Sequence, residues 1–326
     1  MCLRLQHGSV GGSAGYSLTL DHRADQPPNI VIRSYGQYYD VRTPASVLLC
    51  TVRGSVKRER RKTTPVAVGD RVEVTVTGPG EGVIESVAPR RRVLSRLARG
   101  TEDVEQVILA NPDQLVAVFS VAEPEPHLRM LDRFLILAEA RNLAAAIGVN
   151  KIDLDPTGEL RRIFTPYRAA GYPVIETSAI TGEGTDALRD LLAGKISALA
   201  GPSGVGKSSL LNVIAPGFKA RIGEISAATG KGRHTTTSSI LISLDDETYV
   251  ADTPGIRQLG FWGIDFDRLD TYVPEFRPYL QQCRYFDCAH LDEGGCAVLD
   301  AVEAGAIARE RYESYRALKE ADRLDR

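Results

Sequence analysis

The chain has 326 residues, of which 43% are hydrophobic and 25% charged, which is the composition of a globular protein with room for two or three domains. No apolar run approaches the roughly 18 residues of a membrane helix, and the first thirty residues lack the apolar core of a signal peptide. We therefore expect a cytoplasmic protein that makes no membrane contact. The formal net charge of −2 hides an asymmetry, because residues 52–99 contain twelve Lys and Arg against five Asp and Glu.

The N-terminal third predicts a tail followed by a small barrel. Residues 1–34 are rich in Gly, Ser and Pro and are expected to form a flexible extension. Residues 35–98 contain four or five short β-type runs separated by turn residues, which favours an OB-like closed barrel. The loop 57–62 and the run 90–92 hold most of its positive charge. Such barrels often bind single-stranded nucleic acid, although the charge alone fits a solvated loop equally well.

The middle of the chain, residues 99–264, alternates strands with helices. We expect strands at 114–122, 144–150, 173–179 and 196–201, and helices at 128–141, 157–170, 185–192 and from 207 onward. This alternation predicts a parallel sheet with helices on both faces and a ligand at the carboxyl ends of the strands. The strands stop after 264, and residues 265–326 are expected to form a helical domain with helices at 265–282 and 302–323.

A phosphate-binding loop follows the strand at 196–201, where the sequence GPSGVGKS fits the pattern G-x-x-x-x-G-K-[ST]. Its glycines let backbone N–H groups surround phosphates at a helix N-terminus. Lys207 is expected to reach the β- and γ-phosphates, and the Ser208 hydroxyl to bind Mg²⁺. The loop residues expected to contact nucleotide are Gly201, Pro202, Ser203, Gly204, Val205, Gly206, Lys207, Ser208 and Ser209.

The sequence NKID, directly after the strand at 144–150, selects the base. The Asp153 carboxylate can accept both N1–H and N2–H₂ of guanine, whereas adenine offers no such pair of donors, which disfavours an ATPase. Asn150 is expected to face O6 and N7, and the Lys151 stem to cover the ring. The residues expected to contact the base are Asn150, Lys151, Ile152 and Asp153, together with Ser178 and Ala179 at the end of the next strand.

Two later segments match the switches of a nucleotide hydrolase. Asp252 ends an apolar strand in the sequence DTPG, where a carboxylate typically holds Mg²⁺ through water and the Gly255 N–H meets the γ-phosphate. The polar segment 230–237, GKGRHTTT, suits the first switch. Its Mg²⁺ ligand is expected to be Thr236, with Thr237 as the alternative.

The residue that orients the attacking water is less clearly marked. The position after DTPG usually holds a glutamine, but here it is Ile256, which offers no hydrogen bond. His234 in the first switch is the candidate, since an imidazole can accept a proton or position water. Gln258 is a weaker candidate, and a binding partner could supply the water-orienting group instead. From the sequence, His234 fits equally well as a surface histidine without a catalytic role.

Three cysteines and one histidine lie within fourteen residues near the C-terminus. They are Cys283, Cys288, His290 and Cys296. Three thiolates and an imidazole complete a tetrahedral Cys₃His site, which indicates one structural zinc ion and leaves no open position for catalysis.

The order of these motifs is circularly permuted, because the base-recognition motifs precede the phosphate loop and the switches follow it. NKID, GPSGVGKSS, GRHTTT, DTPG and the Cys₃His spacing in this order resemble the RsgA/YjeQ family of circularly permuted GTPases. The resemblance implies an OB domain at 35–98, a P-loop G domain at 99–264 and a zinc domain at 265–326.

The resemblance also implies GTP hydrolysis to GDP, stimulated by the small ribosomal subunit, and a role in the late maturation of that subunit. The expected partners are GTP and GDP with Mg²⁺, the small subunit and its rRNA, and we expect the chain to act as a monomer. The alternative is a GTP-dependent signalling switch that acts through protein partners, with the barrel and the zinc domain as docking surfaces.

Overall fold

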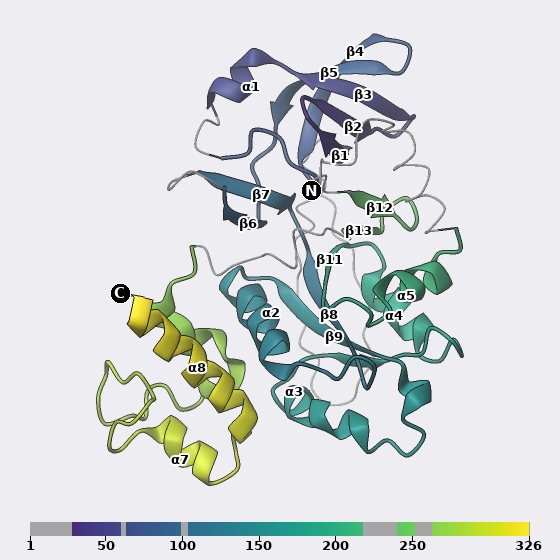
Figure 1. Ribbon diagram of the computed structural model, residues 1–326. Helices are drawn as coiled ribbons and strands as arrows, with labels where there is room; N and C mark the ends of the chain where they lie inside the picture. The colour runs from purple at the N-terminus through teal and green to yellow at the C-terminus, as the bar shows by residue number, and fades with distance from the viewer. Residues whose placement is uncertain (1–27, 60–62, 99–103, 218–239, 252–262, 326) are drawn as a thin grey trace, which may run out of the picture.

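The computed structural model describes residues 28–59, 63–98, 104–217, 240–251 and 263–325. It shows a barrel, a central sheet covered by helices and a C-terminal helical part, in that order along the chain (Figure 1). No helix in these ranges is both long and apolar enough to span a membrane.

The N-terminal part is a closed barrel of five strands in the order β1-β2-β3-β5-β4, which confirms the expected architecture. Side chains that alternate along the strands fill its interior; Val31, Val41, Cys50, Val72 and Ile84 are each fully buried. The elements are β1 (Asn29–Tyr35), β2 (Tyr38–Arg42), β3 (Val47–Val52), α1 (Gly54–Glu59), β4 (Arg71–Gly78) and β5 (Glu81–Val87).

The barrel begins earlier than the sequence suggested, because β1 lies mostly within the stretch assigned to the N-terminal extension. Both faces of this strand are used: Val31 belongs to the core of the barrel, whereas Ile30 packs into the core of the central sheet. The basic stretch that was interpreted as a loop starts inside α1, at the exposed Lys57. Residues 60–62 lie outside the described residues.

One residue of the basic run 90–92 does not belong to the surface charge. The Arg90 guanidinium forms an ion pair with the fully buried Asp70, with two N–O distances of 2.8 Å, and donates to the Thr64 carbonyl at 2.8 Å. Arg91 lies 3.8 Å from Asp113. Of the positive charge that the sequence places in this run, that of Arg90 is therefore neutralised inside the protein.

A two-stranded sheet connects the barrel to the central part. Strand β6 (Val93–Leu97) pairs antiparallel with β7 (Glu105–Ala110), across the expected domain boundary at 98/99. Leu94 and Leu109 are fully buried and belong to the same hydrophobic cluster as the central sheet. Ile30 of the barrel and Leu94 of β6 thus pack into the core of the central sheet, while the barrel interior forms a separate cluster.

The central sheet has six strands in the order β10-β9-β8-β11-β13-β12, and all neighbours are parallel except β12 and β13. This confirms the predicted parallel sheet. Its elements are β8 (Gln114–Ser120), α2 (Leu128–Ala140), β9 (Ala144–Asn150), η1 (Ile152–Leu154), β10 (Val174–Glu176), α4 (Thr185–Leu192), β11 (Ile196–Ala200), α5 (Lys207–Ile214), β12 (Leu241–Ser243) and β13 (Tyr249–Ala251).

Helices cover both faces of the sheet. Strand β8 is therefore buried along its whole length, and its alternate side chains point to opposite faces. Leu115 and Phe119 pack into the cluster that contains α2, whereas Val116 and Val118 pack into the one that contains α4 and α5. With every strand end of the parallel set at one edge, the loops that follow β8, β9, β10 and β11 meet there.

Two of the predicted helices are broken into shorter segments in the structure. The stretch 157–170 forms two short pieces, η2 (Leu160–Phe164) and α3 (Thr165–Ala169). The stretch 265–282 contains only the 3₁₀ segments η4 (Phe266–Tyr272) and η5 (Pro274–Phe276), followed by turns. Pro274 and Pro278 lack the N–H groups that an α-helix needs, which explains why a continuous helix does not form.

The predicted C-terminal helix is two helices, α7 (Ala297–Glu303) and α8 (Arg309–Asp325). Gly305 ends α7 with a φ of +74°. The Gly305 N–H donates to the Val302 carbonyl at 3.1 Å, and the Ala306 N–H donates to the Ala301 carbonyl at 2.9 Å. This is a Schellman cap, which favours glycine because the left-handed backbone disfavours a side chain.

The C-terminal part is held against α2 by a buried cation. The Arg311 side chain on α8 is 3% exposed and pairs with Glu275 at 2.6 and 3.1 Å and with Asp132 of α2. Its guanidinium also lies 5.0 Å from the centre of the Tyr167 ring. Burial would lower the pKa of Arg311, but the two carboxylates more than offset this and raise it.

We expect Arg311→Met to lower the free energy of unfolding of the C-terminal part by about 3–5 kcal/mol, because it leaves the buried Asp132 carboxylate and the largely covered Glu275 carboxylate without their cation. Hydrogen exchange of α8 under native conditions measures this change. Arg316→Met on the same helix is the control: its side chain is 51% exposed and pairs with Glu320, so the loss should stay within about 1 kcal/mol. Equal effects of the two variants would contradict the assigned role of Arg311.

Candidate nucleotide site and metal centre

The phosphate-binding loop joins β11 to α5 at the carboxyl edge of the sheet. Gly201 has a φ of +137°, and a Cβ there would lie 2.0 Å from the Val118 carbonyl oxygen. Gly206 has a φ of +93°, and a Cβ there would lie 2.2 Å from the Asn150 side-chain nitrogen. Both positions need glycine, because the backbone of the loop touches the neighbouring strand and the base-recognition motif directly.

Lys207 begins α5 and points its ammonium group back into this loop. The residue is 7% exposed, and its Nζ donates to the carbonyls of Gly201 at 2.9 Å and Pro202 at 2.7 Å. Ser203, Gly204 and Ser209 are exposed, and Ser208 is half-buried in the first turn of α5. The loop therefore presents a cation, backbone N–H groups and a hydroxyl at one helix N-terminus, a combination suited to a polyphosphate.

Asn150 connects the two halves of the site. It is 1% exposed, and its amide nitrogen donates to the Val205 carbonyl of the phosphate loop at 2.8 Å. Its amide oxygen accepts from the Ala179 N–H at 3.2 Å. The sequence interpretation assigned Asn150 a contact with O6 and N7 of the base; the structure shows a bracing role that this interpretation did not include.

The other base-recognition residues lie beside it. Ser178 is fully buried; its hydroxyl donates to the Asp153 carboxylate and accepts from the Thr181 N–H at 3.1 Å. These bonds orient the half-buried carboxylate. Lys151 has a left-handed φ of +64°, and its Nζ contacts the Glu123 carbonyl in the loop after β8. The sequence reasoning missed Glu123, and only its position shortly after a strand of the same sheet could have suggested it.

Four of the expected site residues lie outside the described residues: Thr236, His234, Asp252 and Gly255. Strand β13, which precedes Asp252 in the chain, ends at Ala251 and pairs there with Ala198 of β11.

The four expected metal ligands converge in the C-terminal part. The ligand atoms of Cys283, Cys288, His290 and Cys296 all lie within 4.8 Å of one another. His290 Nδ1 is 3.3 Å from Cys296 Sγ and 3.6 Å from Cys283 Sγ, and these two sulfurs are 4.0 Å apart. Tetrahedral zinc, with bonds of about 2.3 Å to sulfur and about 2.0 Å to nitrogen, sets its ligands about 3.5–3.8 Å apart. The donor set and its spacing therefore fit zinc.

Two acidic residues that the sequence reasoning missed support these ligands. Asp270 Oδ2 lies 3.5 Å from His290 Nε2, which leaves Nδ1 for a metal. Burial opposes the charge on Asp270, but the hydrogen bond to His290 holds its pKa below the usual range. Glu293 accepts from the N–H groups of Ala289 at 2.9 Å and Leu291 at 2.8 Å. Burial would raise the pKa of Glu293, but these backbone donors lower it to about 2.

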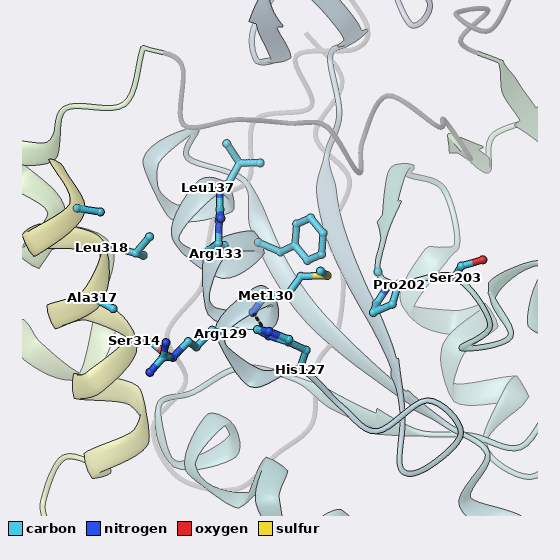
Figure 2. A pocket seen from close by; sticks show the side chains of 13 residues that line it. His127, Arg129, Met130, Arg133, Leu137, Pro202, Ser203, Ser314, Ala317 and Leu318 are labelled. Carbon is cyan, nitrogen blue, oxygen red and sulfur yellow. Dashed lines mark hydrogen bonds between the residues drawn. The ribbon is translucent and has the colours of Figure 1, made fainter. Parts of the chain in front are cut away.

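A cavity of about 700 Å³ lies where the nucleotide site and the C-terminal part approach each other. Figure 2 shows α2 and α8 on one side and Pro202 and Ser203 of the phosphate loop on the other. Met130 and Leu137 of α2 and Leu318 of α8 supply much of its apolar wall. The C-terminal helix and the phosphate loop thus border the same space.

Comparison with known proteins identifies the family. Residues 87–262 match the family model described as RsgA GTPase, and residues 30–84 match the RsgA N-terminal domain. The small ribosomal subunit biogenesis GTPase RsgA of Gemmatimonas aurantiaca is 44% identical over 89% of this chain and 96% of its own length. The protein of the same name from Moorella thermoacetica is 46% identical, over 87% of this chain and 93% of its own.

Solved structures agree. YjeQ from Thermotoga maritima has a TM-score of 0.72 and 37% identity over 90% of this chain and 97% of its own. YloQ, a circularly permuted GTPase, has a TM-score of 0.69 and 30% identity over 94% of this chain and 99% of its own. This chain belongs to the RsgA family and is a circularly permuted GTPase, and the family implies that Mg²⁺ accompanies GTP.

We expect the purified chain to contain one equivalent of zinc and Cys288→Ala to lose it, because three remaining ligands cannot close the tetrahedron. Metal analysis of protein purified without chelators measures this. The same variant should lose hydrogen-exchange protection in α7, since metal binding and local folding are coupled. Cys50→Ala, which changes a buried thiol of the barrel, should retain its zinc. Wild-type protein without zinc would refute the assignment.

Proposed function

We propose that this chain binds the small ribosomal subunit and hydrolyses GTP to GDP there during late maturation of that subunit. The observation that carries the proposal is that relatives named for this function align with nearly the whole chain, including all three of its parts. A signalling switch is not favoured. That alternative would require similarity only at the nucleotide site, whereas the relatives also match the barrel and the C-terminal part.

The proposed roles at the nucleotide are supported by the described contacts of Ser178 and Lys207 and, for the switch residues, by the sequence motifs. Asp153, oriented by Ser178, accepts the paired donors of guanine. Backbone N–H groups of 201–206 and the Lys207 ammonium bind the phosphates. Mg²⁺ bound with GTP neutralises charge that develops on the phosphate oxygens. The proposed contacts at the metal ion and γ-phosphate are Ser208, Thr236, Asp252 and Gly255.

The Cys₃His cluster has a proposed structural role, with one zinc ion per chain. The four protein ligands would fill all positions of a tetrahedron, so the ion would stabilise the fold rather than bind a substrate. Cys283 follows the turns after η5, and Cys296 is the N-cap of α7. The ion therefore would hold together a segment that contains little regular secondary structure.

The proposed rRNA contact is the basic stretch of the barrel that begins at Lys57. Arg90 is not part of it, because Asp70 neutralises its charge. We further propose that the protein acts as a monomer in the cytoplasm, where the particle it serves is assembled.

We expect Asp153→Asn to weaken GTP binding at least about 100-fold and to shift preference toward xanthosine nucleotides, because the amide donates a hydrogen bond where guanine also donates. Calorimetric titration with GDP and with xanthosine diphosphate measures the change. Asp186→Asn, at an exposed position of α4, should leave both affinities unaltered. If Asp153→Asn still prefers guanine, the base assignment is wrong.

We expect purified small subunits to accelerate GTP turnover, and His234→Ala to lower the accelerated rate at least tenfold, about 1.4 kcal/mol of barrier, with GTP affinity nearly unchanged. The reason is that Ile256 cannot orient the attacking water, which leaves the task to another group. Phosphate release with and without subunits measures both rates.

Gln258→Ala is the control for this experiment and should turn over GTP at the wild-type rate. A reversed pattern would assign the water to Gln258, and normal rates in both variants would point to a group of the particle. Wild-type protein that small subunits do not accelerate would sink the proposed function itself.

A further inference from the structure

The loop between the first two metal ligands, residues 284–287, presents two adjacent aromatic rings to solvent. The Phe286 side chain is fully exposed, at 103%, and Tyr285 is 48% exposed. Phe286 is the most exposed of the large hydrophobic side chains that the structure describes. Single exposed apolar residues are common on protein surfaces, but neighbouring aromatic rings at the tip of a loop are typical of a binding surface.

The structure holds this loop in place from three points. Cys283 and Cys288 at its two ends belong to the ligand cluster. The Arg284 N–H donates to the Gly295 carbonyl at 2.9 Å, which ties the loop to the last turn before Cys296. A Cβ at Gly295 would lie 3.2 Å from the Arg284 Cβ, so the two segments pack closely. Because the aromatic rings lie on a restrained backbone, the loop loses little conformational entropy when a partner binds to it.

The sequence that contains the loop is acidic. Residues 278–308 contain five Asp and Glu but only one Lys or Arg, Arg284, and the Arg284 guanidinium lies 5.6 Å from the centre of the Tyr285 ring. Asp287 and Asp292 are exposed. The whole segment 265–326 has fourteen acidic and nine basic residues, the opposite balance to residues 52–99. An acidic segment favours a cationic partner over a phosphate backbone.

We propose that residues 284–287 form a docking surface for a Lys- and Arg-rich protein segment exposed on the small subunit. Aromatic faces bind Lys and Arg side chains through cation–π contacts, and the adjacent, exposed Asp287 carboxylate can pair with the same cations. The inference rests on the proposed function, because it places the partner on the same particle. It separates the two ends of the chain: the basic barrel meets rRNA, and the acidic metal-binding end meets protein.

Photo-crosslinking tests the class of partner. The full chain carries p-benzoylphenylalanine in place of Phe286, is bound to purified small subunits with a non-hydrolysable GTP analogue, and is irradiated. Mass spectrometry should find the crosslink on a protein peptide rich in Lys and Arg. The same probe in place of Val76, a 65% exposed residue of β4, is the control and should not reach that peptide. A crosslink from position 286 to rRNA, or to neither component, overturns the inference.

Binding measurements test the contribution of the surface. Phe286→Ala, and separately Asp287→Asn, should weaken subunit binding about tenfold, with zinc content and GTP affinity at wild-type values. Val76→Ala should bind normally. Undiminished binding by both variants sinks this inference while the proposed function stands. Wild-type protein that does not bind subunits at all removes the proposed function and this inference with it.

Discussion

The nucleotide site depends on one buried side chain, the carboxamide of Asn150. Its nitrogen donates to Val205 in the phosphate loop, and its oxygen accepts from Ala179 in the turn after β10. Removal of this side chain would leave the buried Val205 carbonyl and the half-buried Ala179 N–H without these partners, at about 1–3 kcal/mol for the buried group. The same contact explains Gly206, whose position leaves no room for a Cβ beside the amide. The base-recognition and phosphate-binding segments are therefore fixed relative to each other.

This contact also explains why the permuted order of motifs makes the same kind of site. The segments meet because β9, β10 and β11 end at one edge of a parallel sheet, whatever their order in the chain. The permutation instead changes which part of the chain comes after β13. The next described residue after Ala251 is Gly263, which lies beside Arg141, just after α2. The chain then continues into the C-terminal part.

Helix α2 links this C-terminal part to the sheet. One side of α2 packs on the sheet through Leu131 and Leu135, and Asp132 on another side binds the buried Arg311 of α8. Ile136 of α2 belongs to the hydrophobic cluster of the C-terminal part. Helices α2 and α8 also border the cavity beside Pro202, so the phosphate loop and the C-terminal part face the same space.

The sequence by itself determined the chemistry of this protein. The phosphate loop, NKID and the Cys₃His set are short motifs whose residue types and spacing follow from the ligand, and buried strands such as β8 are apolar along their whole length. The helices at 265–282 and 302–323 were predicted wrongly, because apolar spacing outweighed local signals from Pro274 and Gly305. Only the tertiary structure decided that Arg90 is neutralised by Asp70, that Asn150 braces the phosphate loop, that Asp270 supports His290 and that Arg311 binds Asp132. Each of these pairs joins residues far apart in the chain, and neither partner's sequence neighbourhood carries a trace of the other, since long-range contacts depend on how whole elements pack.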